Sequence, residues 1–212
     1  MIAGSRIRIL LVTGAVLLTV ATTLDVLAGG ALRQWDDRLM LGPHGLRLTE
    51  GGWFWVWRTL VWGGQFWLVG LLVGLAALWT SLRRRSPWPA VTVGVWLVVV
   101  SVVLYLLKTA FGRTAPVSGV DLLYVAGKQS YPSGHAAYAT SCLVVTAMLI
   151  GRTWATWAAH VLAVLVAIAT VMLGYHWPTD SIAGWAFGLL CGVAGCWALS
   201  RFAERAAARP PE

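Results

Sequence analysis

The sequence predicts an all-α integral membrane protein, a six-helix bundle with both termini on the cytoplasmic side. Two observations predict this class: 58% of the 212 residues are hydrophobic while only 11% are charged, and the apolar residues gather in six long runs. A soluble domain carries more charge than this. Because each membrane-spanning helix needs about 20 apolar residues, six spans occupy most of the chain. We therefore expect one membrane domain over residues 1–212.

The expected spans follow the apolar runs in chain order. They cover residues 9–28, 53–82, 88–107, 135–151, 154–175 and 181–200. The first run is longer than a usual signal-peptide core, so we expect a retained helix rather than a cleaved leader. The second run opens on tryptophans at alternate positions, which is typical of a membrane interface. Four glycines of this run are expected at close helix contacts, namely Gly63, Gly64, Gly70 and Gly74.

The stretch between the first two spans, residues 29–52, is polar and is expected to be a solvated loop. Its adjacent carboxylates, Asp36 and Asp37, have no His or Glu beside them at metal-ligand spacing, so we expect no metal there. The three cysteines lie inside apolar runs and form no metal-binding pattern or disulfide framework. We expect them to be buried as small hydrophobic residues.

Basic residues mark one side of the expected bundle. When the six crossings are counted, nine arginines fall on the same side, and they are Arg6, Arg8, Arg83, Arg84, Arg85, Arg152, Arg201, Arg205 and Arg209. The positive-inside rule makes that side cytoplasmic. The net charge of +8 is therefore explained by membrane anchoring, and no nucleic-acid partner is expected.

A polar turn at residues 131–136 introduces the fourth span. Pro132, Ser133 and Gly134 read as a turn that leads into the first turn of a helix. The free amides and the positive dipole end of such a helix bind anions, and the Ser133 and Gly134 amides are candidates for a phosphate. His135 at the same place can exchange a proton near neutral pH.

Two further polar groups reach the same outer face by the count of crossings. Lys108 and Arg113 follow the third span, where they act either as interfacial anchors or as phosphate-binding cations. His176 and Asp180 follow the fifth span at a spacing of four. At this spacing the carboxylate can hold one ring nitrogen of His176 and leave the other free as a nucleophile.

This set of residues is suited to phosphoryl transfer. His176 and His135 have different neighbours, so one can be the nucleophile and the other the general acid while cations neutralise the phosphoryl oxygens. The sequence has no Walker A loop, no H-E-x-x-H pattern and no acidic metal cluster. We therefore expect phosphoryl transfer to His176 and then to water, without a metal or other cofactor.

The same residues resemble the three signature motifs of the type 2 phosphatidic acid phosphatases, lipid phosphate phosphatases related to vanadium haloperoxidases. The motifs lie at residues 108–116, 132–135 and 176–180, and the resemblance defines a phosphatase-like core of about residues 88–199. It implies a six-helix membrane bundle. It also implies that His176 is the nucleophile, that His135 protonates the leaving group and that Asp180 orients His176.

Two positions depart from the family pattern. Ala115 stands where the first motif has arginine before its proline, and Thr170 stands where the third motif has arginine. Arg113 is the expected stand-in, and Arg58 or Arg33 could add a further charge. A charge-assisted contact to phosphate is worth roughly 1.5 to 3 kcal/mol, so we expect weakened rather than absent activity.

The expected function is hydrolysis of a lipid phosphate at the extracytoplasmic face of the cell (plasma or inner) membrane. A polyprenyl diphosphate, phosphatidate or phosphatidylglycerol phosphate would each fit as the substrate, and the lipid bilayer is the expected surrounding partner. A lipid phosphotransferase is the nearest chemical alternative. A non-catalytic lipid-phosphate binding or translocating protein is the alternative from another class, motivated by Ala115 and Thr170. No oligomeric state is indicated.

Overall fold

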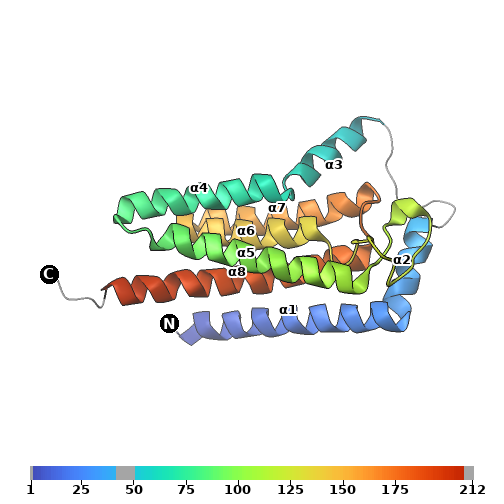
Figure 1. The fold of residues 1–212 in the computed structure, drawn as a ribbon, viewed down its shortest axis with the longest axis horizontal. Helices are drawn as coiled ribbons and strands as arrows, with labels where there is room; N and C mark the ends of the chain where they lie inside the picture. The colour runs from blue at the N-terminus through green and yellow to red at the C-terminus, as the bar shows by residue number, and fades with distance from the viewer. Residues whose placement is uncertain (1, 42–50, 208–212) are drawn as a thin grey trace.

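The computed structural model describes residues 2–41 and 51–207 and confirms the all-α class (Figure 1). Within these residues the regular elements are eight α-helices and one short 3-10 helix. They are α1 (Ile2–Ala28), α2 (Ala31–Leu41), α3 (Gly52–Trp62), α4 (Phe66–Arg84), α5 (Trp88–Phe111), η1 (Pro116–Ser118), α6 (Gly134–Ile150), α7 (Thr153–Met172) and α8 (Pro178–Ala207).

The long helices have the length and composition of membrane spans. Five stretches in the described residues qualify, drawn from α1, α4, α5, α7 and α8, and the apolar α6 is shorter with 17 residues. Large apolar side chains also cover the outside of the bundle, such as Leu10 at 71% exposed and Val98 at 62%. An outer surface of this kind is stable against lipid rather than water.

The second expected span, residues 53–82, is wrong as a single helix. The structure breaks it at Gly63 and Gly64 into α3 and α4, and only α4 qualifies as a membrane span. Glycine is a poor residue for a helix interior, so two in succession favour a break. The amino-terminal part of α3 extends away from the bundle beyond the start of α4 (Figure 1).

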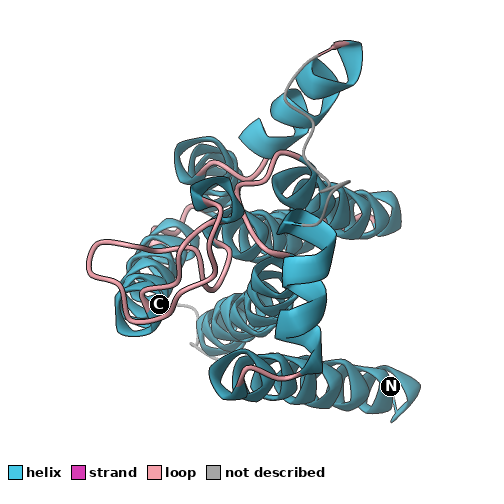
Figure 2. Ribbon diagram, turned by 90° about the vertical axis from the view of Figure 1, so that its right-hand side faces the viewer, coloured by secondary structure: helices cyan, strands magenta, loops and turns pink. Residues whose placement is uncertain are grey.

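The expected solvated loop at residues 29–52 is also wrong where the structure describes it, because it contains α2. The Asp25 carboxylate accepts hydrogen bonds from the backbone amides of Leu32 (3.2 Å) and Arg33 (2.9 Å), which stabilises the start of the helix. Figure 2, which faces this end of the bundle, shows α2 in front of the helix ends together with the loop between α5 and α6. The rest of the expected loop, residues 42–50, lies outside the described residues.

The centre of the bundle is α6, which packs against α4, α7 and α8. Its contact with α8 is close because α8 presents glycines to it. A Cβ atom on Gly188 would lie 2.6 Å from the carbonyl oxygen of Ala137, and one on Gly195 would lie 2.8 Å from Val145 Cγ2. This contact brings the amino-terminal ends of α6 and α8 together at one end of the bundle.

Of the four glycines expected at close contacts, Gly64 has the closest neighbours and Gly74 has none. A Cβ atom on Gly64 would lie 2.6 Å from Val166 Cγ1 and 2.9 Å from the backbone oxygen of His135, whereas Gly74 has open space within 4 Å. The prediction of close packing therefore fails at Gly74. At Gly70 the nearest atom is 3.8 Å away, an ordinary van der Waals contact.

We expect Gly64→Ala to destabilise the folded protein by about 1–3 kcal/mol, because the backbone of His135 cannot move aside as a flexible side chain would. Gly74→Ala, in the following helix α4, is the control and should be neutral or slightly stabilising. Thermal unfolding in detergent measures both. Equal melting temperatures for the two variants would contradict the close contact at Gly64.

Candidate active site

The candidate site lies at the end of the bundle where α5 ends and where α6 and α8 begin (Figure 1). These three ends carry the residues predicted from separate sequence motifs. Lys108 is in the last turn of α5, His135 in the first turn of α6, and Asp180 in the first turn of α8. His176 lies in the connection between α7 and α8.

The amino terminus of α6 is built as an anion-binding end. Ser133 is the N-cap residue, and its hydroxyl accepts a hydrogen bond from the Ala136 amide at 3.4 Å. The Ser133 amide donates to the backbone oxygen of Asp180 at 2.9 Å, which fastens α6 to α8. The amides of Gly134 and His135 have no acceptor within the described residues. These two donors are therefore available to an anion.

The two candidate histidines are neighbours. Their ring centroids are 5.7 Å apart, and the rings meet edge to face at 65°. His176 is 7% exposed, and burial lowers the pKa of its imidazole, while hydrogen bonding and charge attraction from Asp180 oppose that shift. A ring with a lowered pKa is neutral near pH 7 and has a lone pair to donate.

Asp180 is connected to His176 partly through a serine that the sequence motifs did not indicate. The distance from Asp180 Oδ2 to His176 Nδ1 is 3.6 Å, which is long for a hydrogen bond. The hydroxyl of Ser130 donates to Asp180 Oδ2 at 2.5 Å and lies 3.4 Å from His176 Nδ1. Ser130 thus bridges the carboxylate and the ring.

Lys108 has free N–H donors near the amino terminus of α6. Its ammonium donates to the backbone oxygen of Pro132 at 3.1 Å. A lysine ammonium has three N–H donors, so two remain for another acceptor. The ammonium lies 3.8 Å from the point where a Cβ atom on Gly134 would be, close to the helix amides. Lys108 and the α6 amides can therefore bind the same anion.

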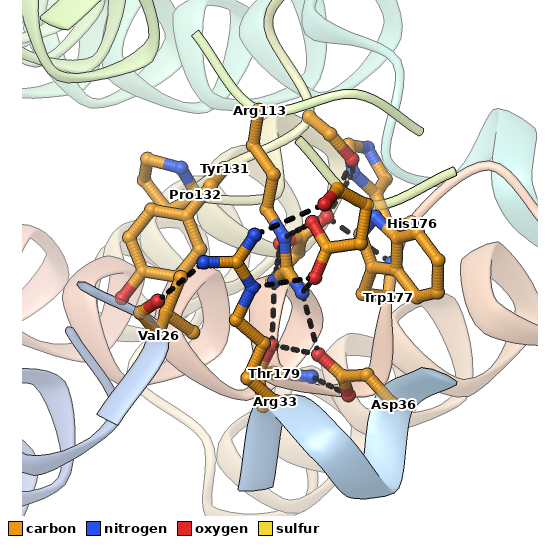
Figure 3. Close-up of polar contacts among 12 residues, drawn as sticks. Val26, Arg33, Asp36, Arg113, Tyr131, Pro132, His176, Trp177 and Thr179 are labelled. Carbon is orange, nitrogen blue, oxygen red and sulfur yellow. Dashed lines mark hydrogen bonds and ion pairs between the residues drawn. The ribbon is translucent and has the colours of Figure 1, made fainter. Parts of the chain in front are cut away.

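Arg113 has partners other than the phosphate oxygens predicted for it. It is fully buried, and its Nε and Nη2 atoms donate to the carboxylate of Asp121 at 2.9 and 2.7 Å. Nη2 also donates to Asp36 at 2.9 Å, and Nη1 donates to Asp180 and to the Thr179 hydroxyl, both at 2.7 Å (Figure 3). A guanidinium has five N–H donors, and these bonds use all five.

Asp36 is a buried member of this network rather than a solvated residue. It is 0% exposed, and its carboxylate accepts from the Thr179 hydroxyl and from the Thr179 amide, the latter at 3.1 Å. Burial raises the pKa of Asp36 to about 6, although bonds from Thr179 and Arg113 favour its charged form. One sequence pattern did indicate the helix α2, because the apolar residues near Asp36 recur at helical spacing. They are Leu32, Trp35, Leu39 and Met40.

The two positions that lack the family arginines have different surroundings. The Thr170 side chain is buried and its hydroxyl lies 2.9 Å from that of Ser181, so it joins α7 to α8. Ala115 lines a pocket of about 310 Å³ beside His176, and the exposed Lys128 lines the same pocket. The ammonium of Lys128 makes no ion pair among the described residues.

The two other expected sources of positive charge are engaged elsewhere. Arg33 donates to the Asp121 carboxylate at 2.8 Å and to the backbone oxygen of Val26 at 3.0 Å. The Arg58 guanidinium lies 5.7 Å from the ring centroid of Phe54 on its own helix. Neither contact places these side chains at His176.

The chain matches the family model described as the PAP2 superfamily over residues 89–204. It is 31% identical over 139 residues to an undecaprenyl-diphosphatase of Sulfolobus acidocaldarius, covering 57% of this chain and 67% of that protein. It is 30% identical over 129 residues to a decaprenylphosphoryl-5-phosphoribose phosphatase of Mycobacterium tuberculosis, covering 60% and 68%. A PAP2-type phosphatidylglycerolphosphate phosphatase from Bacillus subtilis shares the fold, with a TM-score of 0.64, 20% identity and coverage of 90% and 96%.

The fold and the matched motifs define an integral membrane phosphatase. More particularly, the chain belongs to the PAP2 superfamily and is a lipid phosphate phosphatase, as its motifs had indicated. The likeness to the solved structure also confirms a transmembrane bundle.

Proposed function

We propose that the protein hydrolyses a lipid phosphomonoester or diphosphate through a phosphohistidine formed on His176, at the extracytoplasmic face of the cell membrane. The observation that carries the proposal is the pairing of the buried His176 with His135 beside Lys108 and the open amides of α6. We take residues 1–212 as one membrane domain and residues 88–199 as its catalytic core.

In the first step, the Nε2 lone pair of His176 attacks phosphorus, and the bond to the leaving oxygen breaks. His135, in the cationic form that the negative charge of the bound phosphate favours, gives a proton to that oxygen. In the second step, the now neutral His135 takes a proton from a water molecule whose oxygen attacks phosphorus. The phosphorus–nitrogen bond breaks, which releases inorganic phosphate and regenerates neutral His176. The phosphoryl oxygens accept hydrogen bonds from Lys108 and from the backbone amides of Ser133, Gly134 and His135. The Ser133 amide must first break its hydrogen bond to the backbone oxygen of Asp180.

Asp180 and Ser130 orient His176 by holding its Nδ1 side, which leaves Nε2 for the phosphoryl group. Because all five donors of Arg113 are engaged, we assign it a positioning role through Asp180 in place of a direct phosphate contact. Lys128 is the better candidate for the additional cation, since it lines the pocket beside His176 as Arg113 does but makes no ion pair among the described residues.

We propose a polyprenyl phosphate or diphosphate as the substrate class. The support is that the relatives from Sulfolobus and Mycobacterium are both named for polyprenyl substrates. Phosphatidate and phosphatidylglycerol phosphate are the competing substrates to compare with it.

The test is inorganic phosphate release from polyprenyl diphosphate, polyprenyl phosphate, phosphatidate and phosphatidylglycerol phosphate by the purified protein in detergent with EDTA. We expect release that EDTA does not reduce, and fastest turnover of a polyprenyl substrate. Loss of activity in EDTA that added metal restores would contradict the metal-independent mechanism. If no lipid releases phosphate but the lipids still bind tightly, the result would instead support the binding or translocating alternative.

A further inference from the structure

A groove of about 650 Å³ lies at the end of the bundle opposite the candidate active site, between α4 and the last turn of α6. Its walls include Leu72, Leu75, Trp79, Arg83 and Arg84 of α4 and Ile150 of α6. We propose that this groove binds an anionic phospholipid, with a hydrocarbon chain along the apolar part and the phosphate at the two arginines. This site goes beyond the proposed function and does not depend on it.

The groove follows one face of α4. Its residues on this helix recur at intervals of three and four, so they form a single stripe parallel to the helix axis. The stripe is apolar over most of its length and exposed, with Leu75 at 55% and Trp79 at 61%. In a membrane-spanning helix such a stripe faces lipid chains.

The hollow arises because α6 is short. Its 17 residues extend about 26 Å, less than the roughly 30 Å of a bilayer core. The helix ends at Ile150, and Gly151 follows in a left-handed conformation with φ of 68°, so the chain turns away there. The last turns of α4 continue beside the space that α6 leaves, and a lipid chain can fill this space.

The end of the groove favours an anion. Arg83 and Arg84 make no ion pair with a carboxylate among the described residues. The Arg83 guanidinium lies 5.1 Å from the ring centroid of Trp79, which holds it against the groove wall. Two uncompensated guanidinium groups above an apolar channel complement a phospholipid with a negative headgroup.

The groove is separate from the catalytic centre. The start of α4 follows Gly64, which packs on His135, and its 19 residues place Arg84 about 28 Å further along the helix. Figure 1 shows the carboxyl end of α4 at the end of the bundle remote from α2. A lipid in the groove is therefore not a substrate bound for hydrolysis.

The test measures how many phosphatidylglycerol and phosphatidylcholine molecules stay bound to the detergent-purified protein by native mass spectrometry. The phosphate of phosphatidylglycerol is a diester, which the proposed activity does not hydrolyse. We expect wild type to prefer phosphatidylglycerol, and Arg83→Gln/Arg84→Gln to reduce that preference by roughly 10- to 30-fold. Arg85→Gln is the matched control, since Arg85 is adjacent but does not line the groove.

A second variant keeps both arginines and fills the groove. Ala76 lines the groove, so Ala76→Phe should displace the lipid although both arginines remain. Equal retention of the two lipids by wild type would overturn the proposal, as would an equal loss in Arg85→Gln, which would show general surface attraction. A dimer that Ala76→Phe dissociates would also overturn it, because a second copy would then occupy the groove.

Discussion

Replacing His176 by alanine should lower phosphate release at least about a thousandfold, because the variant has no nucleophile at the position between His135 and Asp180. The expected result includes loss of the covalent intermediate. Wild type quenched in base during turnover should carry an alkali-stable, acid-labile phosphate, and His176→Ala should carry none. The lowered pKa of His176 supports this role, since the ring is neutral and nucleophilic near pH 7.

His160→Ala is the matched control for this experiment. His160 lies in the first half of α7, whereas the connection that carries His176 follows the last residue of that helix, so its removal should leave turnover unchanged. His135→Ala should lower turnover by a smaller factor, about 10² to 10⁴, because it removes proton transfer but leaves the nucleophile. Turnover by His176→Ala within tenfold of wild type would contradict the phosphohistidine mechanism.

The sequence was informative where apolar length and helix ends determine position. Lys108, His135 and Asp180 each adjoin the end of an apolar run, and the alternation of crossings brings such ends to one face. The structure accordingly places these residues and His176 together. No comparable sequence pattern shows that a polar residue is buried by partners that are far away in the sequence. Asp36 lies in a polar stretch, and its burial depends on Arg113, 77 residues further along the chain.

The errors in the helical pattern have a similar cause. Average hydropathy continues through Gly63 and Gly64, so it does not show the break between α3 and α4. The residues of α2 have helical periodicity, but their charges made a solvated loop the simpler interpretation. Ser130 was missed because its role comes from its distance to Asp180 and His176, which no spacing in the sequence expresses.

Replacing Arg113 by methionine should destabilise the folded protein by about 3–5 kcal/mol, because three carboxylates would lose the cation that they share. Those carboxylates belong to Asp36, Asp121 and Asp180, and all three side chains are at most 3% exposed. Thermal unfolding in detergent measures the effect. Arg113→Lys should recover only part of the stability, since an ammonium has three donors at one point where the network uses five.

A double-mutant cycle with Asp36 separates this positioning role from a direct phosphate contact. Asp36→Asn should lower the free energy of unfolding less in the Arg113→Met background than in wild type. In that background the Asp36 carboxylate has already lost its cation, and the substitution removes this unpaired charge. Asp37→Asn is the comparison variant and should show a smaller coupling, since Asp37 makes no ion pair with Arg113 in the described structure and interacts with its charge only at longer range. If Arg113 bound phosphate directly, Arg113→Met would raise KM more than it lowers kcat, whatever its effect on the melting temperature. A positioning residue instead lowers kcat together with stability, because Asp180 then no longer holds His176 in place.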